Sequence, residues 1–311
     1  MQFLRCVTPL RPAAKELLVL TILRVALLLG VIALAIPIAG CANPLFLFAN
    51  APTVFGSYDR HADRAYGALA RQKLDVYAPH EARNRPVVIF WYGGSWKHGS
   101  KADYRFVGAA LAERGFVAVV PDYRLYPAVA FPAFCEDGAH ALAWVEAHAQ
   151  EFGGDPQRIV LMGHSAGAQI AAFIAYNHAF VERAGGSARS IVGLVGLSGP
   201  YVLITDTHEL RATFPPPFTE GDWQPLAFVD ARSPPTLLLH GLDDTEVEPE
   251  QSVALRDALV ANHVAVEMRL YAHRRHGDTL APFAWLARRR SSAYEDSVAF
   301  IESVSRSGPS P

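Results

Sequence analysis

The chain has 311 residues, of which 51% are hydrophobic and 19% charged, and its formal net charge at pH 7 is −2. This length fits one large α/β domain or two small ones, with enough apolar residues for a sizeable core. The near-neutral charge and the lack of a basic stripe argue against nucleic acid as a partner, because phosphate binding needs a basic surface.

The first forty residues differ from the rest of the chain. They contain four positively charged side chains and one acidic one, followed by the apolar run Val25–Ile38, which is typical of an export signal. The sequence Ile38-Ala39-Gly40-Cys41 at its end resembles a bacterial lipobox, in which the cysteine is acylated and becomes the new N-terminus. We therefore expect residues 1–40 to be a lipoprotein-type signal peptide and lipidated Cys41 to anchor an exported protein to a membrane of the bacterial cell envelope, on the periplasmic side. An uncleaved membrane anchor is the alternative.

The remaining chain divides into two parts. Residues 41–70 are expected to form a linker, because proline and glycine punctuate them. Over residues 71–306, strand patterns alternate with helix patterns, which predicts a single α/β catalytic domain with a mostly parallel sheet, helices on both faces and a short insertion at 201–230. The expected strands are Leu74–Tyr77, Pro86–Tyr92, Phe116–Val120, Ile159–Met162, Ile191–Leu197, Thr236–His240 and Ala265–Tyr271, and the expected helices are Asp103–Arg114, Ala133–Glu151, Ala166–Tyr176, Pro249–Ala261 and Ser292–Ser303.

A candidate nucleophile lies in the segment Gly163-His164-Ser165-Ala166-Gly167, between the strand Ile159–Met162 and an alanine-rich helix. A serine at such a sharp turn adopts a strained backbone, so the residues two positions away must lack bulk, and glycine meets that need on both sides. The hydroxyl would project at a helix N-terminus, where exposed amides and the helix dipole favour developing negative charge. The pattern alone can arise by chance, but strand, turn and small-residue helix together predict that Ser165 is a nucleophile.

A glycine-rich loop, Tyr92-Gly93-Gly94-Ser95-Trp96, follows an earlier expected strand. Acyl transfer needs main-chain amides aimed at the oxygen of the tetrahedral intermediate. One amide normally belongs to the residue after the nucleophile, here Ala166, and others come from the loop after an earlier strand. This loop is therefore the expected second source of amides; an ordinary glycine turn is the alternative.

The chain carries five short motifs, in the order Tyr92–Trp96, Asp122–Leu125, Gly163–Gly167, Ser198–Tyr201 and His240–Pro249. Together they resemble the esterase and feruloyl-esterase-like branch of the α/β hydrolases, which is related to the hormone-sensitive-lipase-like carboxylesterases and to kynurenine formamidase. The resemblance covers about residues 74–303 and implies the α/β-hydrolase fold. Asp122 and Arg124 resemble a structural loop of that family, in which an ion pair is expected to fix the turn.

The resemblance also implies an oxyanion hole made by the amides of Gly94, Ser95 and Ala166. One departure concerns Tyr92, because the family usually has histidine at this position. That histidine orients the loop without supplying a donor, so the replacement bears on the loop geometry and on substrate preference.

The catalytic acid should lie between the serine and the histidine in chain order. The family pattern H-G-x-x-D-x-x-V-x-P aligns onto His240–Pro249 and places its aspartate at Asp244, which we expect to orient and stabilise an imidazolium. Asp243 is the alternative, and Glu246 a weaker one.

The catalytic base should lie on the loop after the last strand, where Tyr271–Gly277 offers two histidines. The family's spacing favours His276, which a glycine follows, over His273. A metal site made by these two histidines and Asp278 is a further alternative. It is disfavoured because the residues lie on no expected helix and no partner ligands stand elsewhere.

The expected reaction is hydrolysis of a small-molecule carboxylic ester, without a cofactor or a metal. His276 takes the proton of Ser165, main-chain amides hold the oxyanion, Asp244 keeps the imidazole tautomer, and water cleaves the acyl-enzyme. The insertion at 201–230 is either a small lid or an ordinary packed loop. The alternatives for the function are an amidase or formamidase-type hydrolase, and a non-catalytic, membrane-tethered binding protein on a hydrolase fold.

Overall fold

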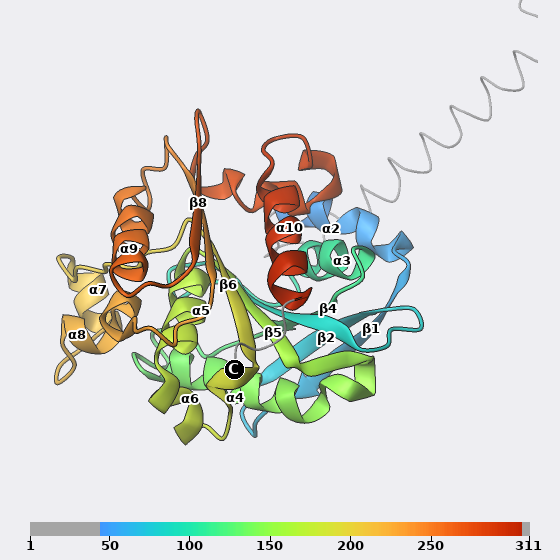
Figure 1. Ribbon diagram of the computed structural model, residues 1–311, viewed down its shortest axis with the longest axis horizontal. Helices are drawn as coiled ribbons and strands as arrows, with labels where there is room; N and C mark the ends of the chain where they lie inside the picture. The colour runs from blue at the N-terminus through green and yellow to red at the C-terminus, as the bar shows by residue number, and fades with distance from the viewer. Residues whose placement is uncertain (1–43, 307–311) are drawn as a thin grey trace, which may run out of the picture. The chain divides into compact units, whose positions relative to one another are not determined.

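The computed structural model describes residues 44–306 (Figure 1). The expected signal peptide, residues 1–40, and the expected lipidation site, Cys41, lie outside the described residues. Within the described range, the helices are too short or too polar to cross a membrane.

One mixed sheet of eight strands organises the described part of the chain, in the order β1-β2-β4-β3-β5-β6-β7-β8. The pairs β1/β2 and β2/β4 are antiparallel, and all other neighbouring strands are parallel, as the sequence analysis expected. The strands are β1 Tyr58–Ala65, β2 Lys73–Pro79, β3 Arg85–Trp91, β4 Val117–Pro121, β5 Gly154–His164, β6 Ile191–Leu197, β7 Thr236–Gly241 and β8 Val266–Tyr271.

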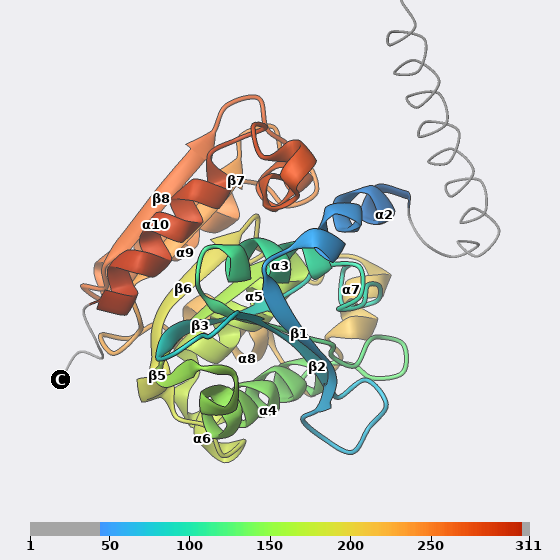
Figure 2. The ribbon, with the colours of Figure 1, turned by 90° about the vertical axis from the view of Figure 1, so that its right-hand side faces the viewer.

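Helices cover both faces of this sheet (Figures 1 and 2). Helices α3 and α10 pack on one face, and α4, α5 and α9 pack on the other. The α-helices are α2 Pro44–Asn50, α3 Arg105–Glu113, α4 Ala133–His148, α5 Ala166–Tyr176, α6 His178–Arg183, α7 His208–Thr213, α8 Glu220–Trp223, α9 Glu250–Ala261 and α10 Ala293–Arg306.

The core forms where the sequence is continuously apolar. Residues 87–91 of β3 are fully buried, because helices shield both sides of this central strand. Every residue of α5 is buried as well, since its alanines let the helix approach the sheet closely. Because β3, β5, β7 and β8 run parallel, the loops that follow them meet at one edge of the sheet. That edge carries the candidate catalytic residues.

The segment expected as a linker differs from expectation. Its described part contains α2, the 3₁₀ helix η1 (Ala51–Phe55) and strand β1, and the compact unit begins at Phe48 instead of residue 71. Strand β1 escapes a pattern-based prediction because it is an edge strand with mostly exposed, polar residues. Its backbone pairs with β2, and Arg60 forms a 2.6 Å ion pair with the buried Asp75.

The insertion at 201–230 packs against the body through its aromatic residues. Phe214 and Trp223 are 2% and 3% exposed, and the Phe214 ring stands edge-on to the Trp96 ring at 4.9 Å. Gln169 of α5 connects the insertion to the loop after β3. Its side-chain amide accepts a hydrogen bond from Trp96 Nε1 and donates one to the carbonyl of Trp223. The insertion is therefore a packed segment, although part of it lines the pocket described below.

Candidate active site

Ser165 lies on a strained turn between β5 and α5. Its φ is 54° and its ψ is −127°, which places a non-glycine residue in a costly backbone conformation. A Cβ on Gly163 would lie 2.2 Å from the carbonyl oxygen of Gly167, and one on Gly167 would lie 2.1 Å from that of Trp91. Both glycines are thus required by close backbone contact, and the half-buried serine is held at the first turn of α5.

The carboxylate of Asp244 and the imidazole of His276 form a direct hydrogen bond. Nδ1 of His276 lies 2.8 Å from Oδ2 of Asp244, and both residues are buried. An ionised carboxylate only accepts hydrogen bonds, so Nδ1 carries the proton and Nε2 is left as a base. The loops after β7 and β8 therefore bring together the two residues that the sequence analysis assigned as acid and base.

Hydrogen bonds keep Asp244 ionised. Burial raises the pKa of this carboxyl, but hydrogen bonds from His240, from His276 and from the Val247 amide outweigh it, so the pKa lies below its usual value. The amides of Glu246 and Val247 each donate to Oδ1 at 3.0 Å. The charge needed to stabilise an imidazolium is therefore present at neutral pH.

The alternative acid and base lie in solvent. His273 and Asp243 are 90% and 54% exposed at their side chains, and their nearest approach is 3.8 Å. Within residues 44–306 no group of three or more histidine, cysteine or acidic side chains is placed to hold a metal ion. His273, His276 and Asp278 thus do not converge as metal ligands would.

A second histidine, His240, holds Asp244 from the other side, and sequence reasoning assigned it no role. Its Nε2 lies 2.8 Å from the carbonyl oxygen of Val247 and 3.2 Å from Oδ2 of Asp244, while Nδ1 lies 2.7 Å from the hydroxyl of Ser252. Because the carbonyl and the carboxylate only accept, Nε2 carries the proton and Nδ1 accepts from the serine. The histidine of the H-G-x-x-D motif was the sequence feature that could have revealed this role.

A third histidine, His164, fixes the backbone of the base. Its Nε2 donates to the carbonyl oxygen of His276 at 3.1 Å, and Thr279 Oγ1 donates to the same oxygen at 3.3 Å. Nδ1 of His164 is buried without a partner among the described residues. Burial lowers the pKa of His164 to about 3, and the neighbouring His276 adds to this shift, so the ring is neutral.

The glycine-rich loop after β3 passes close to the nucleophile. A Cβ on Gly93 would lie 2.8 Å from the Cβ of Ser165, and Gly94 has a φ of 124°, which favours glycine. The main-chain amides of Gly94, Ser95 and Ala166 donate to no group within the described part of the protein. Three donors are therefore left available near the serine, as an oxyanion hole requires, and their catalytic role stays a prediction.

Tyr92 fixes the start of this loop through its hydroxyl. It donates to Oδ1 of Asp122 at 2.7 Å and accepts from Arg71 Nη2 at 2.8 Å. The same Oδ1 accepts a hydrogen bond from the main-chain amide of Lys101 at 2.7 Å, so Asp122 also holds the far end of the loop. A phenol therefore anchors the loop where the family usually has an imidazole.

The expected ion pair between Asp122 and Arg124 is wrong. Arg124 Nε donates to Oδ2 of Asp137 at 2.8 Å, and the Arg124 amide donates to the same atom at 2.7 Å. Asp137 is fully buried on α4 and needs a cation, whereas Asp122 is held by Tyr92 and Arg71. Tertiary packing of α4 decided this pairing.

Ser165 and His276 line one pocket of about 400 Å³. Ser95 and Ala166 also line it, while Gly94 lies outside its lining. The insertion contributes part of the wall, and the remaining lining residues are Trp96, Pro200, Leu203, Thr207, Glu209, Leu210, Thr213, Glu246 and Val247. A serine on a strained turn, a histidine with a fixed tautomer and free amides thus share one cavity, which suits attack on a carbonyl group.

Comparisons with known proteins agree with this geometry. Residues 74–200 match the BD-FAE family model. A probable isoprenylcysteine alpha-carbonyl methylesterase of Arabidopsis thaliana is 33% identical over 237 residues, which cover 68% of this chain and 56% of the relative. The esterase LipC of Mycobacterium tuberculosis is 31% identical over 217 residues, covering 63% of this chain and 54% of the relative. The chain thus spans little more than half the length of these curated relatives.

Solved structures show the same fold. A truncated carbohydrate esterase from gut microbiota superimposes with a TM-score of 0.70 at 22% identity, covering 81% of this chain and 98% of that one. An inhibited esterase B from Lactobacillus rhamnosis superimposes with a TM-score of 0.71 at 21% identity, covering 91% of this chain and 97% of that one. At this level of identity, the likeness is one of architecture.

The two neighbouring aspartates allow a matched test of the acid. Asp244→Asn should lower kcat on p-nitrophenyl acetate by about 10³–10⁴-fold, because an amide favours the wrong tautomer of His276. Asp243→Asn, at an exposed carboxylate, should change kcat by less than about twofold. Steady-state kinetics of both variants measure this, and an equal loss at the two positions would contradict the assignment.

The buried, neutral His164 predicts a loss of stability in acid. Above pH 6.5 the ring is neutral in both states, but below it the unfolded chain takes up a proton that the folded protein binds only near pH 3. The free energy of unfolding should therefore fall with pH through this window, by at most about 1.4 kcal/mol per pH unit from this group.

Urea unfolding of the wild type and of His164→Gln from about pH 4.5 to 7 tests this. The His164→Gln variant should be less stable at neutral pH, and its free energy of unfolding should depend less steeply on pH. His273→Gln removes an exposed histidine and serves as the control, with a slope equal to that of the wild type. Equal slopes in all three proteins would show that His164 does not couple folding to protons.

Proposed function

We propose that this chain, which has the α/β-hydrolase fold, is a serine esterase that cleaves carboxylic esters through an acyl-enzyme on Ser165. One observation carries the proposal: the hydrogen bond from His276 Nδ1 to Asp244 lies at the pocket that also holds Ser165. The esterases and the methylesterases among the relatives support the same reaction class. The chain spans only part of those relatives, so their particular substrates are not carried over.

The first half of the reaction acylates the serine. Nε2 of His276 takes the proton of the Ser165 hydroxyl while Oγ forms a bond to the ester carbonyl carbon, and the carbonyl oxygen becomes an oxyanion. The C–O bond to the alcohol then breaks, and the imidazolium returns the proton to the leaving oxygen. In the second half, water takes the place of the serine hydroxyl and Ser165 is released with a carboxylic acid as the product.

Two electrostatic contributions lower the barrier. Main-chain amides that point at the oxyanion contribute about 3 kcal/mol each in such sites. Ser95 and Ala166 line the pocket and supply two of these amides. Gly94, the residue before Ser95, supplies the third. The charge on Asp244 stabilises the imidazolium that forms when His276 holds the proton, which a neutral side chain cannot do.

The pocket indicates an ester of modest size. Its volume of about 400 Å³ lies at the lower end of the range for small-molecule sites. Trp96, Leu203 and Leu210 offer apolar surface to an acyl or alcohol group, and the carboxylate of Glu246 disfavours a negative charge on the substrate. We infer a neutral ester with a short acyl chain as the substrate class.

A fluorophosphonate probe tests the nucleophile directly. The wild-type protein should be labelled covalently, whereas Ser165→Ala should give no labelling and should lose almost all hydrolysis of p-nitrophenyl esters. Ser95→Ala is the matched control, because it removes a hydroxyl from the same pocket and keeps the main-chain amide. It should retain labelling and most of the activity. Equal labelling of the wild type and Ser165→Ala would overturn the proposal.

We further propose that the protein is exported and held on a membrane of the bacterial cell envelope by acylated Cys41. The apolar run Val25–Ile38, which ends in Ile38-Ala39-Gly40-Cys41, supports this localisation. Two or more acyl chains bury enough CH₂ groups for a firm attachment.

Mass spectrometry of the mature N-terminus tests the anchor. The chain should begin at Cys41 and carry the mass of its acyl groups, and Cys41→Ser should keep its leader uncleaved. An intact Met1 terminus on the wild-type protein would contradict acylation at this site.

A further inference from the structure

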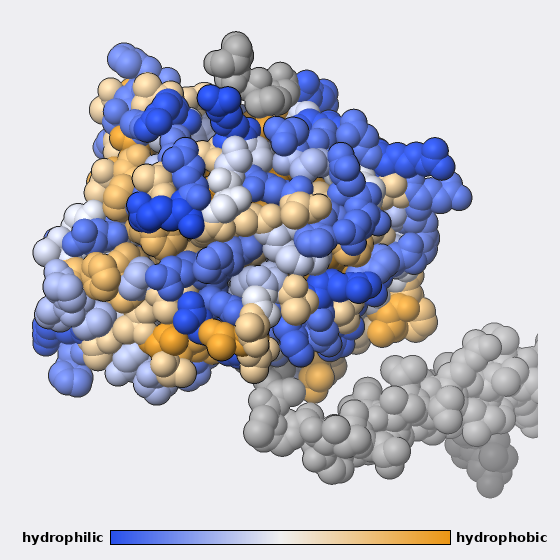
Figure 3. All heavy atoms as spheres, turned by 90° about the horizontal axis from the view of Figure 1, so that it is seen from below, coloured by the Kyte–Doolittle hydropathy of each residue, from blue (hydrophilic) through white to orange (hydrophobic). Residues whose placement is uncertain are grey.

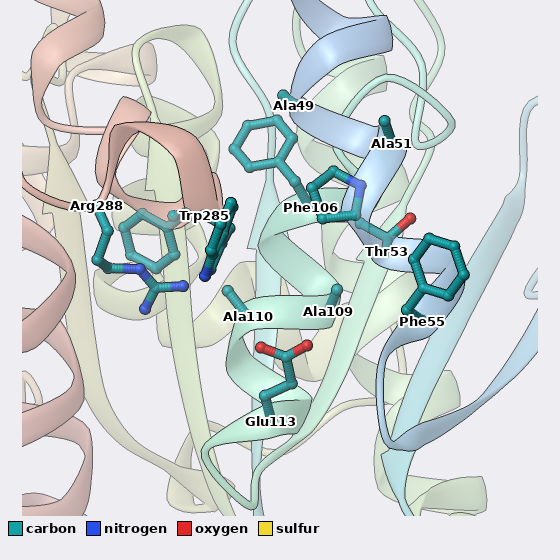
Figure 4. Close-up of a pocket in the computed structure, with 12 residues that line it drawn as sticks. Ala49, Ala51, Thr53, Phe55, Phe106, Ala109, Ala110, Glu113, Trp285 and Arg288 are labelled. Atoms are coloured by element: carbon teal, nitrogen blue, oxygen red, sulfur yellow. The ribbon is translucent and has the colours of Figure 1, made fainter. Parts of the chain in front are cut away.

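A second, larger groove lies away from the catalytic pocket. Its volume is about 580 Å³, and it is formed by η1, by helix α3 and by the segment after β8 that contains the 3₁₀ helix η7 (Trp285–Ala287) (Figure 4). Ala109, Ala110 and Glu113 of α3 lie between Phe55 on one side and Trp285 on the other. The lining is apolar apart from Thr53, Glu113 and Arg288.

Large apolar side chains stand exposed at and beside this groove. Val54 and Phe55 of η1 are 75% and 88% exposed, and Trp285 and Leu286 of η7 are 69% and 67% exposed. We call these four residues the apolar rim. On the face shown in Figure 3, apolar and polar residues are interspersed. Neighbouring large apolar side chains in water are unfavourable, so the rim indicates a surface that another phase or molecule covers.

The chemistry of the rim fits the boundary between water and lipid. Tryptophan and phenylalanine are the side chains that prefer this boundary, and arginine accompanies them where headgroups are anionic. Trp285 and Leu286 are followed by Arg288-Arg289-Arg290. Arg288 lies over the Tyr294 ring at 3.5 Å and Arg290 pairs with Asp278 at 3.0 Å, while Arg289 is exposed with no ion pair among the described residues.

The length of chain before the described residues places the rim near the expected anchor. Ala51, where η1 begins, is the tenth residue after Cys41, which is at most about 36 Å of extended chain. A protein attached at Cys41, or through the apolar run Val25–Ile38, therefore keeps η1 within reach of the lipid surface.

We propose that the apolar rim docks onto the lipid bilayer to which the N-terminal segment attaches the chain. In this arrangement Phe55 and Trp285 enter the boundary between headgroups and acyl chains, and Arg289 faces anionic headgroups. The inference rests on the proposed anchoring, and it adds that the catalytic domain has one fixed face toward the membrane. A second copy of the chain is the alternative occupant that the test distinguishes.

Tryptophan fluorescence gives a matched test, because three of the five tryptophans, Trp91, Trp96 and Trp223, are buried. Trp144 lies on α4, on the other face of the sheet from α3. The full-length protein is reconstituted into phosphatidylcholine–phosphatidylglycerol vesicles with and without bromine on the acyl chains. Bromine quenches only indoles that reach the lipid, so the wild type and Trp144→Phe should be quenched, whereas Trp285→Phe should lose most of this quenching.

The outcomes separate the proposals from one another. If the wild type floats with the vesicles but shows no quenching, or if Trp285→Phe is quenched as much as the wild type, docking is overturned and anchoring stands. If the wild type does not float, the anchoring proposal fails and docking fails with it. A dimer in detergent that Trp285→Phe converts to a monomer would assign the rim to a second copy. Hydrolysis of p-nitrophenyl acetate, measured in the same vesicles, should be equal in all three proteins and reports separately on the catalytic proposal.

Discussion

The hydrogen bond between His276 and Asp244 is the interaction on which the proposed chemistry depends. It fixes the proton on Nδ1, and only then is Nε2 able to take a proton from Ser165. The carboxylate can serve this purpose because His240 and main-chain amides satisfy its other lone pairs. A buried charge without these partners would be too costly to keep.

His276, His240 and His164 are buried around this bond and have different roles. The group to which each imidazole donates its hydrogen bond determines its role. His240 donates to Asp244 and Val247, and His164 donates to the carbonyl of His276. His164 is held neutral by burial, so it positions the base without placing a second positive charge beside it. Because His164 stays neutral in the folded protein, the free energy of unfolding is expected to fall in acid.

The fold brings these residues together through the parallel order of the sheet. Strands β3, β5, β7 and β8 end at one edge, so the glycine-rich loop, Ser165, Asp244 and His276 converge although they lie far apart in sequence. Backbone contacts of only 2–3 Å for an added Cβ explain the glycines at 93, 163 and 167. The apolar rim lies on other elements, η1 and η7, so the proposed membrane contact and the proposed catalysis use separate surfaces.

The sequence by itself determined the strands other than β1, the main helices and the turn at Ser165, because continuous apolar runs and required glycines are local properties. It also favoured Asp244 and His276 over Asp243 and His273, through the spacing of family motifs. Only the tertiary structure decided the polar edge strand β1, the pairing of Arg124 with Asp137 and the support of Asp244 by His240. These depend on residues distant in sequence whose burial and partners no local pattern records.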